Sequence, residues 1–145
     1  MSRRNRSAAF YVETAITLFF LLCTAAVIAQ LFSTALQNSR LAGEMTRAEF
    51  AAEEEAERLA AAPTLGDWAA AVQGAGAQLT RDGDSYTARL PLNEGEGGGW
   101  VLVELQAEET DGGRLARAQI SAGRGEKASF SLETGRYWQG EGGQP

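Results

Sequence analysis

The distribution of apolar residues divides the chain into three stretches. Residues 15–29 are almost continuously apolar, and with their flanks from 8 to 32 they supply the roughly 20 residues that a helix needs to cross a bilayer. From 33 to 62 the apolar positions recur at steps of three or four, which is a helical period. After residue 64 they alternate in short runs typical of strands. The pattern predicts one long helix followed by a small, strand-rich domain.

The middle stretch, 33–62, predicts a helix with a single apolar stripe. The stripe consists of Leu41, Met45, Ala48, Ala52, Ala56 and Leu59. We expect it to be buried against the rest of the domain, and the other, glutamate-rich faces to be solvated. Glu54 and Arg58 have the i,i+4 order that favours an ion pair. Phe50 falls off the stripe; it is either a contact for a neighbouring subunit or an ordinary exposed phenylalanine.

The last stretch predicts an antiparallel sheet. Pro63 should end the long helix, and Thr64 can cap a short helix over 65–73 that Trp68 anchors. Strands are expected over 77–80, 85–92, 100–108, 115–122 and 128–134, with a hairpin turn at Asp82-Gly83. Four or five such strands have one face to bury, and the apolar stripe can cover it. The predicted fold class is α+β, a long N-terminal helix packed on a small C-terminal antiparallel sheet.

Glu13 stands immediately before the apolar run, behind a basic segment with Arg3, Arg4 and Arg6. A charged side chain inside a bilayer costs roughly 2.5 to 3.5 kcal/mol, so it usually has a partner that neutralises it. A basic leader, the small residues Ala8 and Ala9, an acidic residue and then a hydrophobic helix resemble the N-terminal segment of the type IV pilin and pseudopilin superfamily. The predicted helix and sheet extend this resemblance, in outline, to the whole chain.

The resemblance implies a processing site at Ala8, Ala9 and Phe10. In the family a prepilin peptidase removes the leader on the cytoplasmic side, the new N-terminus can be methylated, and the fifth mature residue is typically Glu. A cut after Ala8 makes Glu13 the fifth residue, whereas a cut after Ala9 makes Phe10 the first and Glu13 the fourth. The family usually has Gly before the cut, where this chain has Ala8.

Glu13 is the candidate residue for subunit assembly. Cleavage exposes an α-amino group that is mostly cationic at neutral pH. If Glu13 of one subunit meets the terminal amine of an incoming subunit, the two charges cancel, whereas a wrong register leaves both unpaired. The alternative is that Glu13 lies among lipid headgroups and reaches water, as charged residues at helix ends commonly do.

These patterns divide the chain into a leader (1–8), a transmembrane and assembly helix (9–32), an extracytoplasmic amphipathic helix (33–62), a domain with a short helix and sheet (63–138) and a disordered Gly-rich tail (139–145). The arginines of the leader place the N-terminus in the cytoplasm and the domain outside, in the inner membrane or on a surface pilus. An ordinary signal peptide is the competing interpretation of the first thirty residues or so. Glu13 and the uninterrupted helical pattern argue against it.

Composition argues against several other functions. The formal net charge is −6, which disfavours nucleic acid as a partner, and there is no histidine to act as a base or ligand. The single Cys23 allows no intramolecular disulfide. No nucleophile stands beside a recognisable base, and Asp82 with Asp84 suits a turn better than a calcium site, so we expect neither enzymatic activity nor a cofactor or metal.

Two functions therefore remain open. In the first, the chain is a pilus or pseudopilus subunit whose partners are the prepilin peptidase, other pilin or pseudopilin subunits, the inner-membrane assembly platform and membrane lipid. It could belong to a type II secretion, competence, pilus or tight-adherence system. In the second, it is a permanently anchored single-pass protein whose extracytoplasmic domain binds another envelope partner without polymerising.

Overall fold

In a computed structural model, which describes residues 3–92 and 98–140, the chain is an α+β protein, as expected. The elements in chain order are α1 (Arg3–Ala61), α2 (Leu65–Gly74), β1 (Gln78–Asp82), β2 (Ser85–Leu92), β3 (Gly99–Thr110), β4 (Gly113–Arg124) and β5 (Lys127–Gln139). The chain forms two compact units, Met1–Ala42 and Gly43–Pro145.

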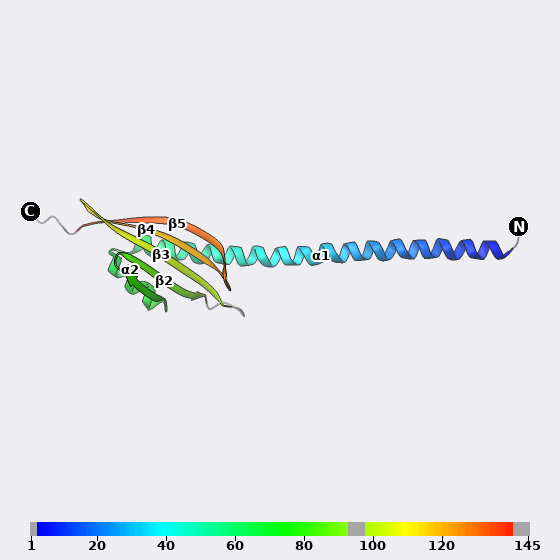
Figure 1. Cartoon of the computed structure of the whole chain (residues 1–145), viewed down its shortest axis with the longest axis horizontal. Helices are drawn as coiled ribbons and strands as arrows, with labels where there is room; N and C mark the ends of the chain where they lie inside the picture. Colours follow the sequence, from blue (N-terminus) through cyan, green and yellow to red (C-terminus); the bar gives the residue numbers. More distant parts are fainter. Residues whose placement is uncertain (1–2, 93–97, 141–145) are drawn as a thin grey trace, which may run out of the picture. The chain divides into compact units, whose positions relative to one another are not determined.

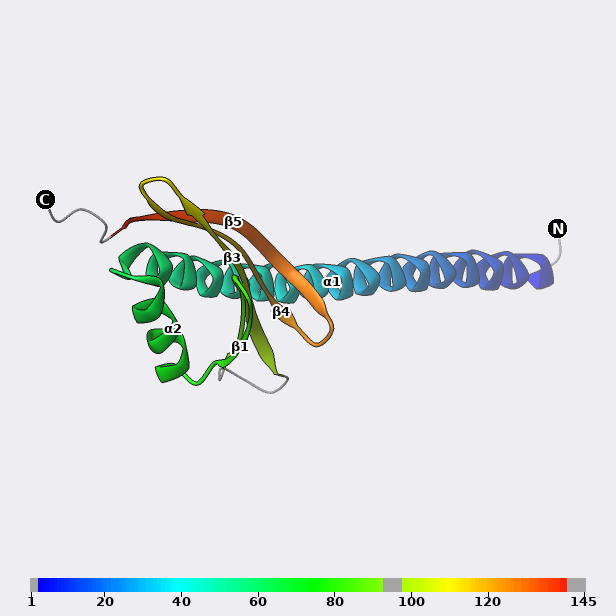
Figure 2. The ribbon, with the colours of Figure 1, turned by 60° about the vertical axis from the view of Figure 1, so that its left-hand side comes forward.

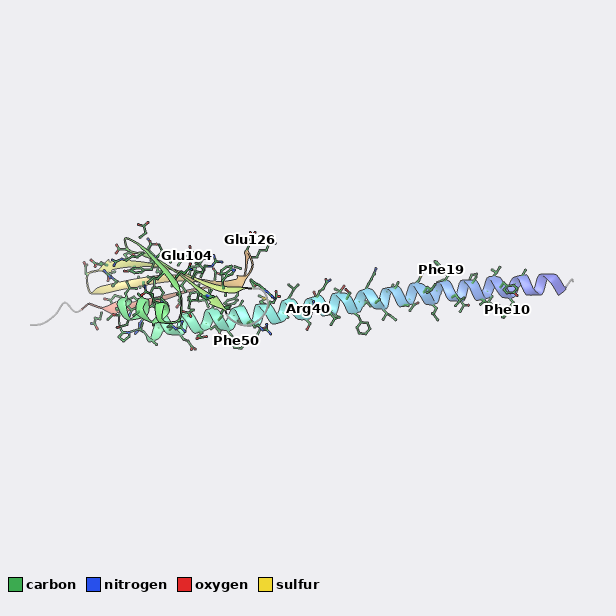
Figure 3. The ribbon with its side chains drawn as sticks, turned by 90° about the horizontal axis from the view of Figure 1, so that it is seen from below. Phe10, Phe19, Arg40, Phe50, Glu104 and Glu126 are labelled. Carbon is green, nitrogen blue, oxygen red and sulfur yellow. The ribbon has the colours of Figure 1, made fainter. Side chains whose placement is uncertain are left out.

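The first unit is helical throughout its described part. From residue 8, where the described side chains begin, to residue 42, every side chain is exposed. This part of α1 contains a window with a mean hydropathy of 2.3 and no buried residue, long and apolar enough to cross a membrane. Figure 3 shows Phe10 and Phe19 projecting from the helix surface. Signal sequences share this length and composition, so the helix alone does not distinguish a signal sequence from a transmembrane helix.

The second unit contains a five-stranded antiparallel sheet in the order β1-β2-β3-β4-β5. Each strand therefore pairs with its neighbour in sequence. The predicted first hairpin is confirmed: Asp82 pairs with Ser85, and Gly83, with φ of 60°, occupies the first position of the two-residue turn. The pairing of β4 with β5 contains an irregularity at Ala122/Gly123. Glycine is required there because a Cβ on Gly123 would lie 2.2 Å from the carbonyl oxygen of Lys127.

The C-terminal part of α1 and α2 cover one face of this sheet. Figure 1 shows the sheet lying along that part of α1, and Figure 2 shows the strands crossing the helix obliquely. The helices contribute Ala48, Ala52, Leu59, Ala62, Leu65, Trp68 and Val72 to the core, and the strands contribute mainly β2, β3 and β4 side chains. Trp68 packs edge-to-face on Tyr86, with ring centroids 6.3 Å apart. The predicted packing of helix on sheet is thus confirmed.

The apolar stripe is buried over only part of its length. Ala48, Ala52 and Leu59 are in the core, as expected, and Ala56 packs against it. The prediction was wrong for Leu41 and Met45, whose exposed fractions are 63% and 54%. A helical period identifies the face of a helix that can be buried, but it carries no information about where the covering sheet ends.

The end of α1 is defined by two polar contacts. The helix ends at Ala61, next to Pro63, and the indole Nε1–H of the buried Trp138 donates a hydrogen bond of 2.8 Å to the Ala62 carbonyl. Thr64 is the N-cap of α2, as predicted, since its Oγ1 accepts a bond of 3.1 Å from the backbone N–H of Asp67. These contacts fix the turn of the chain between the two helices.

Four of the five strands are longer than the sequence pattern indicated, whereas β2 has the predicted bounds, 85–92. β5 continues through Gln139, so the predicted Gly-rich tail begins within a strand, and its last five residues, 141–145, lie outside the described residues. Thr134 and Arg136 lie on the half-buried face of β5 and interrupt its apolar alternation. Backbone pairing with β4 nevertheless continues beyond them, to Gln139 opposite Gly113.

Candidate assembly site

Glu13 lies on α1, in the first unit, and its side chain is exposed. It shares a shallow groove on the helix surface with five neighbouring side chains. The groove is lined by Ala8, Ala9, Val12, Glu13, Ile16 and Thr17. These positions form two adjacent rows along one face of a helix, so small and apolar side chains surround a single carboxylate.

Glu13 has no ion pair with any side chain that the structure describes, from residue 8 onward. Its exposed carboxylate is accessible to water in the isolated chain. In a bilayer or among packed helices that water is absent, and the carboxylate needs a cation or hydrogen-bond donors from another molecule. The charge thus becomes costly only where the apolar helix is covered.

Thr17 is the polar neighbour of Glu13 in this groove. Its Oγ1–H donates a hydrogen bond of 2.9 Å to the backbone carbonyl of Glu13, one helical turn earlier. Thr14, Thr24 and Thr34 bond the carbonyls of Phe10, Phe20 and Gln30 in the same way. Such bonds satisfy the hydroxyl donor inside the helix, which lowers the cost of burying threonine in an apolar environment.

The residues of the predicted processing site, Ala8, Ala9 and Phe10, are all exposed and all helical. The two candidate bonds, after Ala8 and after Ala9, therefore have the same backbone conformation and the same accessibility. Only the spacing to Glu13 distinguishes them.

Glu55 is a feature that the sequence pattern assigned wrongly. We expected it on the solvated acidic face, but its exposed fraction is 4%. It ion-pairs through Oε1 with Arg58, which also bonds Glu54 at 3.1 Å, whereas Oε2 is buried without a hydrogen-bond partner. Burial is the main reason that the pKa of Glu55 is raised; Arg58 opposes this effect and Glu54 adds to it. The sequence does carry a signal for this burial: Glu55 lies three residues after Ala52 and four before Leu59, which places it on the apolar stripe.

A groove of about 510 Å³ lies beside Glu55 in the second unit. Its walls come from α1 and from the adjoining ends of β2, β3 and β4, and Arg124 at its rim bonds Glu44 at 3.0 Å. Phe50 lines the same groove and is 66% exposed (Figure 3). Its predicted contact with a neighbouring subunit stays a prediction.

No metal centre is formed by the described part of the chain, where no three Asp, Glu or Cys side chains are placed to hold an ion. Asp82 and Asp84 flank Gly83 in the β1–β2 hairpin, which is the turn that the sequence suggested. Comparison of the chain with protein-family models, with curated proteins and with solved structures found no match.

Proposed function

We propose that the chain is a non-enzymatic, prepilin-like subunit, stored in the membrane and assembled into a pilus or pseudopilus after its leader is removed. One observation carries the proposal. Glu13, a carboxylate with no ion pair among the side chains described from residue 8 onward, begins an exposed apolar helix that continues into an α+β domain of pilin-like organisation.

The amount of exposed apolar surface supports an assembled state. Large side chains such as Phe19, Phe20 and Leu22 are each more than half exposed. Apolar burial contributes about 25 cal/mol per Å², so leaving this helix in water would be strongly unfavourable. A bilayer covers it during storage, and the helices of neighbouring subunits would cover it in a filament.

The partner of Glu13 in this proposal is the terminal amine of the next subunit. An ammonium can neutralise the carboxylate and pair with it only when the two helices have one particular axial offset. A shifted subunit would leave two charges buried and unpaired, which costs several kcal/mol. Glu13 would thereby set the register of assembly. The prepilin peptidase, an inner-membrane assembly platform and membrane lipid are the other partners that this function requires.

The direction of insertion follows from the basic leader. Arg3, Arg4 and Arg6 precede the apolar helix, so the positive-inside rule keeps the N-terminus in the cytoplasm and exports the second unit. Processing on the cytoplasmic side would then release the leader without altering the exported domain.

Processing is tested by intact-mass measurement of the chain from its native membrane, with Ala8→Leu and Ala9→Leu as paired variants. We expect loss of residues 1–8 in the wild type and an intact leader in Ala8→Leu, because a bulky residue before the cut blocks the peptidase. Ala9→Leu should still be cut. The reverse result would place the cut after Ala9 and remove the argument from the spacing of Glu13. An intact wild-type N-terminus would favour the permanently anchored, non-polymerising protein.

Assembly is tested with Glu13→Gln and Glu13→Ala. Neither cleavage nor insertion needs the ion pair, so both should proceed normally. Subunit crosslinking in the membrane should fall strongly, because the incoming amine would lack its counter-charge. Crosslinking at the wild-type yield would show that Glu13 only reaches the headgroup region.

A further inference from the structure

The face of α1 that carries Glu13 also carries a second oxygen acceptor, the hydroxyl of Thr17. Both residues line the same groove. They are one helical turn apart, a separation at which the Cβ atoms of two residues are about 5–6 Å from each other. Side chains on a helix lean towards its N-terminus, so Thr17 leans towards the backbone of Glu13, and Glu13 towards that of Ala9.

The hydrogen bonding of Thr17 leaves its oxygen free to accept. A threonine hydroxyl has one donor and two acceptor lone pairs. The donor is used, since Oγ1–H bonds the Glu13 carbonyl at 2.9 Å. The lone pairs have no partner among the described residues and the side chain is exposed. In this arrangement Thr17 can offer only an acceptor to a group that approaches the groove.

An ammonium group matches this arrangement of acceptors. It has three N–H donors, and in a dry environment each unsatisfied donor is costly. One or both carboxylate oxygens of Glu13 can accept hydrogen bonds from the ammonium. A further acceptor one turn away satisfies an N–H group of the ammonium that would otherwise face apolar side chains. We propose that Thr17 is the second acceptor for the incoming subunit's terminal amine, so that Glu13 supplies the charge and Thr17 fixes the position of the ammonium. This inference rests on the proposed function.

Another threonine of the helix allows this role to be distinguished from the hydrogen bond that a threonine hydroxyl makes to the backbone one turn earlier. Thr24 makes the same bond, to the Phe20 carbonyl at 2.9 Å, and is equally exposed. It lies eleven residues after Glu13, close to the same helical face but about 16 Å further along the axis. Thr24 is thus out of reach of an ammonium at Glu13, and it provides a control of identical chemistry.

The experiment uses the mature chain, from which only the leader has been removed. It is labelled with donor and acceptor dyes and reconstituted in liposomes. Association is measured by energy transfer as the protein-to-lipid ratio is raised. The variants are Thr17→Val, Thr17→Ser and Thr24→Val. Valine has the shape of threonine without the hydroxyl, serine keeps the hydroxyl, and the two valine variants raise the hydrophobicity of the helix equally.

We expect Thr17→Val to need about a tenfold higher protein-to-lipid ratio for half-maximal association, since one hydrogen bond to a charged group is lost. Thr17→Ser and Thr24→Val should associate like the wild type. Wild-type association of Thr17→Val, or an equal loss in Thr24→Val, would overturn the inference.

The variant Glu13→Gln separates this inference from the proposed function. If Glu13→Gln abolishes association while Thr17→Val leaves it unchanged, only the role of Thr17 is wrong. If Glu13→Gln associates like the wild type, the proposed assembly role itself fails. In the Glu13→Gln background, Thr17→Val should cause no further loss, because without the carboxylate the ammonium is no longer held beside Thr17.

Discussion

The two parts of α1 have the same secondary structure and opposite surroundings. From residue 8 to residue 42 every side chain is exposed, although this part holds the most apolar window in the chain. From residue 43 to residue 61 the helix is richer in charge, yet Ala48, Ala52 and Leu59 are buried. Burial in the single chain therefore follows the availability of a covering sheet and not hydrophobicity. The more apolar part has no such cover in the single chain, and it is long and apolar enough to cross a membrane.

The strongest test of this difference is a pair of aspartate substitutions. Leu59→Asp places a charge at a position that is 1% exposed and removes a core side chain, a cost of about 3 kcal/mol or more. Because small domains are stable by only about 5–15 kcal/mol, we expect the second unit to be largely unfolded or severely destabilised. All three tryptophans, Trp68, Trp100 and Trp138, lie in this unit, so their fluorescence during urea titration reports its unfolding.

Met45→Asp is the matched control, on the same predicted stripe but exposed. It should shift the free energy of unfolding by no more than about 0.5 kcal/mol. If Met45→Asp destabilises the unit as much as Leu59→Asp does, the sheet covers more of the helix than the structure shows, and Met45 is not exposed in solution.

A smaller effect is expected at the end of the helix. Trp138→Phe removes the buried hydrogen bond to the Ala62 carbonyl and leaves that oxygen without its donor, which should cost about 1–3 kcal/mol. The urea midpoint, followed through Trp68, measures the loss. Trp100→Phe is the control: its Nε1 also bonds a carbonyl, that of Gly125, but at an exposed site where water can replace it. An equal loss of stability in the two variants would show that burial does not determine how much the indole hydrogen bond contributes to the free energy of unfolding.

Glu55 makes the stability of the second unit depend on pH. Its pKa is raised above the ordinary value of 4.5, chiefly by burial, so the folded state keeps this proton to a higher pH than the unfolded state does. As pH rises from 4.5 through the raised pKa, the contribution of Glu55 to the free energy of unfolding must fall. We expect Glu55→Gln to be increasingly stable relative to the wild type over this range.

Urea titrations of both proteins at a series of pH values measure that difference. Glu54→Gln serves as the comparison, because Glu54 adds to the raised pKa of Glu55 while its own side chain is largely exposed. In Glu54→Gln the fall in stability with rising pH should be smaller than in the wild type but should remain, since burial, the main cause of the raised pKa, is kept. A Glu55→Gln curve parallel to that of the wild type would mean that Glu55 is solvated.

The smallest expected effect lies at the boundary of the two units. Gly43 is the single glycine of α1, and a Cβ there would meet no atom within 4 Å. Gly43→Ala should stabilise the helix locally by about 0.5–1 kcal/mol, since alanine loses less backbone entropy than glycine. Hydrogen exchange of the nearby amides should slow several-fold, while the urea midpoint of the second unit changes little. Unchanged exchange would indicate that a conformation other than helix is required at Gly43.

Local and periodic features were accessible from the sequence. The apolar run, the cap at Thr64, the turn at Gly83 and the alternation along β3 depend on neighbouring residues, and each led to an element that the structure contains. Glu13 was chosen by its charge at the start of the apolar run, whereas the predicted processing residues followed from the resemblance to the pilin superfamily. The structure adds their common exposure and the groove that unites Glu13 with Thr17.

The chain by itself thus determined a long helix, an antiparallel sheet and an acidic residue at the start of an apolar run, because periodicity and charge are properties of sequence. Tertiary structure decided which part of the stripe is covered. Met45 and Leu59 lie on the same predicted stripe, but only Leu59 is buried under the sheet. Glu55 is buried because its position on the helix faces the core. Burial depends on what packs opposite a residue, and that partner comes from strands distant in the chain.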